Sequence, residues 1–149
     1  MKLVRTLMLV ALASTSTISA TADDRKSSTR SLGAYNIDLS QTSVSGISSG
    51  GFMTVQMHAA HADNIVGIGV FAGGPYACAG TGGQLSNVDT AMNTCMAGKA
   101  DASTALIRLK DAANINAIAP VESQRTDKIW LYSGYNDGVV KQPTMDALE

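Results

Sequence analysis

The stretch VSGISSGG, from Val44 to Gly51, decides how the rest of this 149-residue chain is interpreted. It contains a GxSxG pattern centred on Ser48, with a β-prone run before it and a helix-like run after it. A strand that turns sharply into a helix at such a serine is a nucleophile elbow, in which the serine oxygen stands clear of the sheet. Gly46 and Gly50, two residues on either side, would remove Cβ atoms that clash in this turn. The pattern predicts Ser48 as a catalytic nucleophile, with a structural turn as the alternative.

Two further residues fit the chemistry of such a serine. The backbone N–H of Ser49, next in the chain, would point to the place where an oxyanion forms. Asp137 follows the β-prone run KIWLYS at 128–133, on a loop of sequence GYNDGVV. Sites of α/β proteins gather at the carboxyl ends of parallel strands, and the order Ser then Asp is that of an α/β-hydrolase triad. We therefore predict Asp137 as the triad acid, with a solvated turn aspartate as the alternative.

The start of the chain has the features of a signal peptide, residues 1–22. Lys2 and Arg5 form a basic start, LMLVALA at 7–13 an apolar core, and Ala20 to Ala22 a cleavage site of the A-x-A type. The apolar core is far shorter than the roughly 20 residues that span a bilayer. We therefore predict a secreted, extracellular or periplasmic protein with no membrane partner after cleavage. The charged, Ser-rich segment 23–34 is expected to be flexible.

The charge of the chain bears on its partners, and its two cysteines fit export. The chain has 11 basic and 12 acidic residues, a net charge of −1, so no nucleic-acid partner is expected. Cys78 and Cys95 could pair in an oxidising compartment, and closing that loop would stabilise the fold by about 3 kcal/mol. The rival interpretation is a catalytic thiol, which requires a histidine partner, and neither histidine of the chain is placed for it.

Strand and helix patterns alternate along residues 35–149, which we interpret as one partial catalytic domain. The run IVGIGVFA at 65–72 is continuously apolar, as in a central parallel strand covered on both faces. The run GFMTVQMHAAHA at 51–62 predicts a helix buried nearly all round. The alternation indicates an α/β fold with a parallel sheet. The other expected elements are an edge strand at 35–39, a loop at 81–89, a helix at 100–117, a strand at 128–133 and a helix beginning at 143.

A serine triad also needs a histidine, and the chain contains only His58 and His61. At 1.5 Å per residue along the predicted helix they lie roughly 15 and 20 Å from Ser48, too far to take its proton. With Thr54 they form a polar stripe, so we expect ordinary residues of the polar helix face rather than a metal pair. Few residues follow Asp137, and few strands precede the elbow. We therefore expect the N-terminal fragment of a circularly permuted α/β-hydrolase fold, inactive by itself.

Several longer motifs show a family resemblance over residues 43–140. They resemble the catalytic domain of extracellular poly(3-hydroxybutyrate) depolymerases, and GVFAGGPYACA is far more specific than GxSxG. The resemblance implies a secreted serine esterase of circularly permuted α/β-hydrolase fold that cuts poly(3-hydroxyalkanoate) polymer or oligomer through an acyl-enzyme. The motifs are SVSGISSGGFMTVQMHAAHA at 43–62, GVFAGGPYACA at 69–79, TCM at 94–96 and KIWLYSGYNDGVV at 128–140.

By the same resemblance, Ser48 is the nucleophile, Ser49 an oxyanion donor and Asp137 the triad acid, while Cys78 and Cys95 form a disulfide. The histidine and the second oxyanion donor of the family would lie beyond Glu149. No metal or organic cofactor is needed for this chemistry.

Aromatic residues beside the predicted loops suit a hydrophobic polyester. Phe52, Tyr76 and Tyr135 adjoin the active edge, and we predict that one or more of them line the substrate groove, with core packing as the alternative. Two other functions remain open: a secreted esterase of another substrate class, such as a feruloyl or acetyl-xylan esterase, and a non-catalytic polymer-binding remnant. Hydrolysis of polymer granules would indicate a depolymerase, and hydrolysis of plant-wall esters an esterase of another class. Hydrolysis of neither would indicate a non-catalytic remnant.

Overall fold

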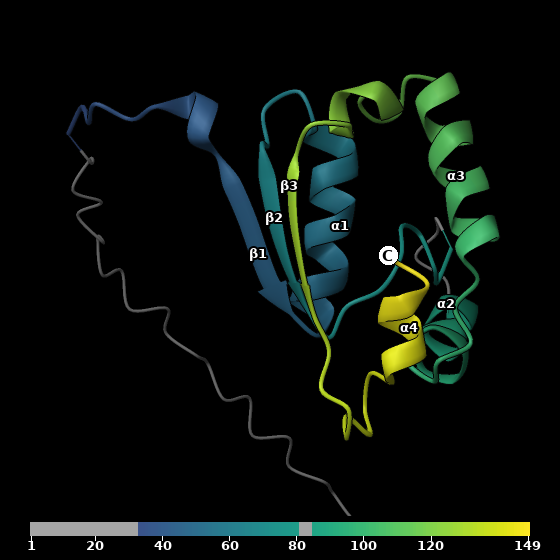
Figure 1. The fold of residues 1–149 in the computed structure, drawn as a ribbon. Coiled ribbons are helices and arrows are strands. Elements are labelled where there is room, and N and C mark those ends of the chain that lie inside the picture. Colours follow the sequence, from purple (N-terminus) through teal and green to yellow (C-terminus); the bar gives the residue numbers. More distant parts are fainter. Residues whose placement is uncertain (1–32, 81–84) are drawn as a thin grey trace, which may run out of the picture. The chain divides into compact units, whose positions relative to one another are not determined.

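The computed structural model describes residues 33–80 and 85–149, and the fold lies in the unit from Asn36 to Glu149 (Figure 1). The predicted signal peptide, 1–22, and nearly all of the predicted flexible segment, 23–34, lie outside the described residues.

A parallel sheet of three strands organises this unit. Its order follows the chain: β1 (Ser43–Ile47), β2 (Gly67–Phe71) and β3 (Lys128–Tyr132). The register places Ile47 beside Phe71 and Phe71 beside Tyr132, so the loops that follow β1 and β3 leave the sheet at the same edge. The predicted parallel α/β arrangement is confirmed, with the apolar run of residues 65–72 supplying the middle strand.

Helices connect the strands, and Figure 1 shows them on one side of the sheet. Asp101 caps the start of α3 (Ala102–Asn114): its side chain accepts a hydrogen bond from the backbone N–H of Thr104 (2.7 Å), and that contact lowers the pKa of the carboxyl. No helix in the described part of the chain is long and apolar enough to cross a bilayer. The elements are α1 (Ser49–His61), α2 (Leu85–Thr90), the π-helical turn η2 (Ala91–Cys95), α3 (Ala102–Asn114), the 3-10 turn η3 (Val121–Gln124) and α4 (Gln142–Asp146).

Helix α1 packs against the sheet through a face that contains polar residues. Val55 joins Ile68 and Val70 of β2 in the buried core, but Thr54 and His58 lie on the same face. Thr54 is tolerated there because its hydroxyl donates to the Gly50 carbonyl (2.9 Å). The predicted polar stripe is therefore buried at these two positions, and the prediction of a helix buried nearly all round is wrong. The opposite face of α1 reaches solvent, with Met53 57% exposed.

Two local predictions differ from the structure. Residues 35–39 form no strand; the chain instead enters the 3-10 turn η1 (Leu39–Gln41), where the Asp38 carboxylate accepts from the backbone N–H of Ser40 (3.0 Å). That local bond competes with strand pairing. The expected loop at 81–89 is also too long, because α2 begins at Leu85.

Aromatic side chains gather on the face of the sheet away from α1. The Phe71 and Trp130 rings lie 4.6 Å apart between centroids, and the Trp130 and Tyr132 rings are stacked at 6.0 Å. Trp130 is 52% exposed, and Ile47 and Tyr132 are exposed as well. This face is therefore open to solvent, so the expectation that the strand at 65–72 is covered on both faces is wrong.

Candidate active site

Ser48 forms the turn between β1 and α1 in a conformation that few residues adopt. Its φ is 56° and its ψ is −122°, which places an L-residue in a region that costs about 1–3 kcal/mol. Two hydrogen bonds hold it there: the Ser48 N–H donates to the Phe71 carbonyl (2.9 Å), and the Ser48 carbonyl accepts from the Phe52 N–H (3.0 Å). The strand–turn–helix geometry that the GxSxG pattern predicts is present at this serine.

Glycines permit the close approach of β1, α1 and the loop after β2. A Cβ at Gly46 would meet the Gly50 carbonyl and lie 2.9 Å from the Thr54 hydroxyl. A Cβ at Gly50 would meet nothing within 4 Å, so the expectation that Gly50 relieves a clash is wrong. Gly51 has that role instead, because its Cβ would lie 2.9 Å from the Phe71 carbonyl and 3.1 Å from the Cα of Gly73.

Ser49 is the first residue of α1. Its N–H belongs to the first turn, where the helix offers no carbonyl to accept it. The same end of a helix carries partial positive charge and favours an anion. These features suit the predicted oxyanion donor.

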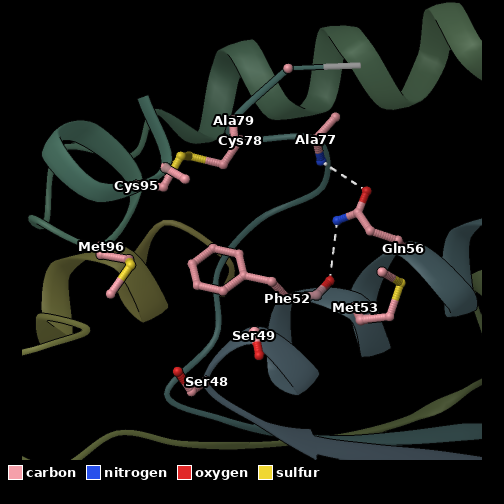
Figure 2. Close-up of a pocket in the computed structure, with 12 residues that line it drawn as sticks. Ser48, Ser49, Phe52, Met53, Gln56, Ala77, Cys78, Ala79, Cys95 and Met96 are labelled. Carbon is pink, nitrogen blue, oxygen red and sulfur yellow. Dashed lines mark hydrogen bonds between the residues drawn. A yellow bond between two sulfur atoms is a disulfide. The ribbon is translucent and has the colours of Figure 1, made fainter. Parts of the chain in front are cut away.

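A cavity of about 500 Å³ opens beside Ser48 (Figure 2). The first turns of α1 form one side, and residues 77–80 with η2 form the other. Its lining is mainly apolar, and the volume is that of a small-molecule site. The lining residues are Ser48, Ser49, Phe52, Met53, Gln56, Ala77, Cys78, Ala79, Gly80, Ala91, Cys95 and Met96.

A disulfide between Cys78 and Cys95 joins two parts of this cavity wall, with the two Cα atoms 5.9 Å apart. The predicted pairing is confirmed. Because both cysteines of the chain are in the bridge, the alternative of a catalytic thiol is excluded for this state.

Asp137 lies on the loop after β3, at the sheet edge where Ser48 follows β1. One oxygen, Oδ1, accepts from the backbone N–H groups of Val139 (2.8 Å) and Val140 (3.0 Å). The Asp137 N–H donates to the Gly134 carbonyl (3.1 Å), which closes the turn. Asp137 is half-buried, and its carboxylate is held by its own loop through Oδ1.

The two histidines are placed away from the elbow. His58 is 3% exposed, and its Nε2 donates to Asp127 Oδ2 (2.7 Å) just before β3 begins. That is the amino end of the strand, whereas Ser48 lies at the carboxyl end of the sheet. His61 is exposed at the end of α1. Among residues 33–80 and 85–149, no three His, Cys, Asp or Glu side chains are grouped to hold a metal.

The aromatic residues expected in a substrate groove have different positions. Phe52 lines the cavity beside Ser48, between Ser48 and the disulfide in Figure 2. Tyr76 packs against the core cluster and lines a different cavity, on the side of α1 that faces α3. Tyr135 is 89% exposed on the loop that carries Asp137.

Sequence reasoning did not single out Met53 and Gln56 as cavity residues. Together with Ser49 and Phe52 they recur at the spacing of one helix face. Counting three, four and seven residues from the start of the helix would have found both.

A strained serine at a strand–turn–helix elbow, at the carboxyl edge of a parallel sheet, defines part of an α/β-hydrolase-type fold. Two solved structures agree: a PHB depolymerase from Penicillium funiculosum, and a serine-to-alanine variant of a PHB depolymerase complexed with an R3HB trimer. Each superposes with a TM-score of 0.65 at 35% identity, over 77% of this chain and 34% of the solved chain.

Curated relatives bear the same name. The chain is 44% identical over 120 residues to a poly(3-hydroxybutyrate) depolymerase of Delftia acidovorans and 37% identical over 120 residues to a polyhydroxybutyrate depolymerase of Talaromyces funiculosus. By sequence and by structure, the chain is homologous to poly(3-hydroxybutyrate) depolymerases. The two matches cover 78% and 79% of this chain. They cover only 23% and 33% of the respective relatives. No family model matches it.

Proposed function

We propose that the protein is a serine esterase that hydrolyses poly(3-hydroxybutyrate), or a related poly(3-hydroxyalkanoate), with Ser48 as its nucleophile. The observation that carries this proposal is the elbow at Ser48, with φ of 56°, beside an apolar cavity of about 500 Å³. The homology to depolymerases supplies the substrate class.

The reaction proceeds in two steps. Ser48 Oγ attacks the ester carbonyl, its proton passes to a general base, and the negative charge on the carbonyl oxygen is stabilised by the Ser49 N–H. The ester C–O bond then breaks, and the base gives the proton to the departing alcohol. Water attacks the acyl-enzyme in the second step, which releases the acid and restores Ser48.

Asp137 orients the general base through the carboxylate oxygen that its own loop does not use. The base is a histidine in this mechanism, and it is neither of the two in this chain. His58 is bonded to Asp127, and His61 lies at the far end of α1. We therefore expect a histidine of the full-length protein outside these 149 residues.

Secretion belongs to the same proposal. The basic start, apolar core and A-x-A site at residues 1–22 are those of a signal peptide. The Cys78–Cys95 disulfide supports an oxidising compartment.

The test is the Ser48→Ala variant of the protein expressed from its full coding sequence. We expect hydrolysis of 3-hydroxybutyrate oligomers and polymer granules to fall by at least about 10⁴-fold, because the nucleophile is lost while the fold is kept. A fluorophosphonate probe should label Ser48 in the parent protein. Unchanged hydrolysis by Ser48→Ala would refute the assignment, and granule binding by a parent without hydrolysis would favour a non-catalytic polymer-binding role.

A further inference from the structure

The wall of the cavity opposite α1 contains a strained residue. Ala77 has φ of 48°, although it carries a Cβ, and it is buried. The left-handed region costs an alanine about 1–2 kcal/mol. Ala77 stays in this conformation only because its surroundings hold it there.

Two side chains from different helices hold the Ala77 backbone. Gln56 of α1 accepts from the Ala77 N–H through Oε1 (3.1 Å), while its Nε2 donates to the Phe52 carbonyl (3.2 Å), as Figure 2 shows. Arg108 of α3 donates from Nη1 to the carbonyls of Ala77 (2.6 Å) and Cys78 (2.9 Å). Both polar groups of the Ala77 backbone are therefore bonded to side chains.

The strength and partial burial of these hydrogen bonds should keep the Ala77 backbone in place. Gln56 and Arg108 are both half-buried, and a hydrogen bond from a guanidinium is about twice as strong as one between neutral groups. The Cys78–Cys95 bridge fastens the next residue to η2. The segment is thus held from α1, from α3 and from η2, which together leave it little freedom to move away from Ser48.

We propose that Gln56 and Arg108 are positioning residues that fix the Ala77–Cys78 backbone as the wall against which the acyl part of the ester rests while Ser48 attacks. The inference rests on the function proposed above. It adds that the Ala77–Cys78 wall contributes to the affinity for the acyl part of the substrate. Gln56 shares the cavity with Ser48, Phe52 and Ala77, so a shift of the wall changes the width of the space next to the nucleophile. Arg108 is not a lining residue and acts only through the wall.

The test compares Gln56→Met and Arg108→Met in the protein expressed from its full coding sequence. Gln41→Met and Arg125→Met are matched controls, because both parent side chains are exposed. Gln41 precedes β1 at the other end of the sheet, and Arg125 follows η3. For a 3-hydroxybutyrate trimer, we expect KM to rise about tenfold or more in each test variant, because each loses at least one hydrogen bond to the wall, with kcat within about twofold. For a small acetate ester, which needs little of the wall, kcat/KM should stay within about twofold.

The double variant adds a second readout. Because both side chains bond the backbone of the same residue, Ala77, Gln56→Met and Arg108→Met together should raise KM for the trimer by clearly less than the product of the single effects. A purely structural role would lower the melting temperature without this division between KM and kcat. If a methionine variant fails to fold, Arg108→Lys, which keeps the charge and one donor, takes its place in the comparison, with a smaller rise in KM expected.

Unchanged KM for the trimer in folded variants, or an equal loss on both substrates, would overturn the inference. Independent, multiplicative effects in the double variant would also count against a shared wall. Failure of the proposed function is a separate outcome, since it would appear as an active Ser48→Ala variant or as a parent protein that binds granules without hydrolysing them.

Discussion

The backbone N–H of Ser48 donates to the carbonyl of Phe71 at 2.9 Å, so the turn after β1 is anchored to the last residue of β2. The bond extends the β1–β2 pairing by one residue into the turn. The unusual backbone conformation of the serine is therefore stabilised by the middle strand of the sheet, and substitutions that push β1 away from α1 or β2 should affect the site.

The glycines around the elbow should respond differently to one added methyl group. Gly46→Ala should destabilise the protein by about 1–3 kcal/mol, because the new Cβ meets the Gly50 carbonyl. Gly50→Ala is the matched control, since its Cβ points into open space on a helix, and it should be neutral or stabilising by up to about 1 kcal/mol. Urea unfolding measures both. Equal changes in unfolding free energy for the two variants would contradict the steric difference between Gly46 and Gly50.

Asp137→Asn should reduce activity and leave the loop intact. The amide keeps an oxygen that can accept from Val139 and Val140, whereas the negative charge that supports the general base is lost. We expect kcat to fall about 10⁴-fold, with little change in melting temperature. Asp146→Asn, at an exposed carboxylate in α4, serves as the control. Near-normal turnover in Asp137→Asn would make this residue a turn aspartate.

The His58–Asp127 pair should matter for stability rather than for catalysis. His58→Leu leaves a carboxylate that is 7% exposed without its partner, which should cost about 3 kcal/mol. His61→Leu should cost little, because the ring is exposed. Thermal unfolding of the two variants tests the difference, and kcat should change little in either. A large loss of kcat in well-folded His58→Leu would contradict this assignment.

Removing the disulfide should loosen the fold. The bridge closes a loop with a sequence separation of 17, and the double variant Cys78→Ser, Cys95→Ser should lose about 3 kcal/mol of unfolding free energy. Chemical reduction of the parent protein should give a loss of similar size. An unchanged melting temperature would show that the neighbouring hydrogen bonds suffice to hold the segment.

Much of the fold can be predicted from the sequence because its main signals are local. The apolar run at 65–72 indicates the middle strand without knowledge of its neighbours in the sheet. The GxSxG pattern indicates the turn at Ser48 because the residues that define this turn are five consecutive positions.

The remaining features depend on contacts between distant parts of the chain. Helical periodicity places His58 in a polar stripe. Its burial depends on the hydrogen bond to Asp127, which lies 69 positions away and cannot be found from the local pattern. Likewise, Gly50 and Gly51 are alike in sequence, and only the position of the Phe71 carbonyl decides which of them must lack a Cβ. Arg108 could not be assigned because nothing local connects it with the Ala77 carbonyl.

The open aromatic face of the sheet gives the protein an intrinsic fluorescent reporter. Trp130 is the only tryptophan in the sequence, and it lies half in solvent beside Phe71 and Tyr132. Its emission should therefore resemble that of a hydrated indole while this face is open and move to shorter wavelength when anything covers it. A single emission spectrum can thus follow the covering of the sheet in any preparation of the protein, independently of whether the ester bond is cut.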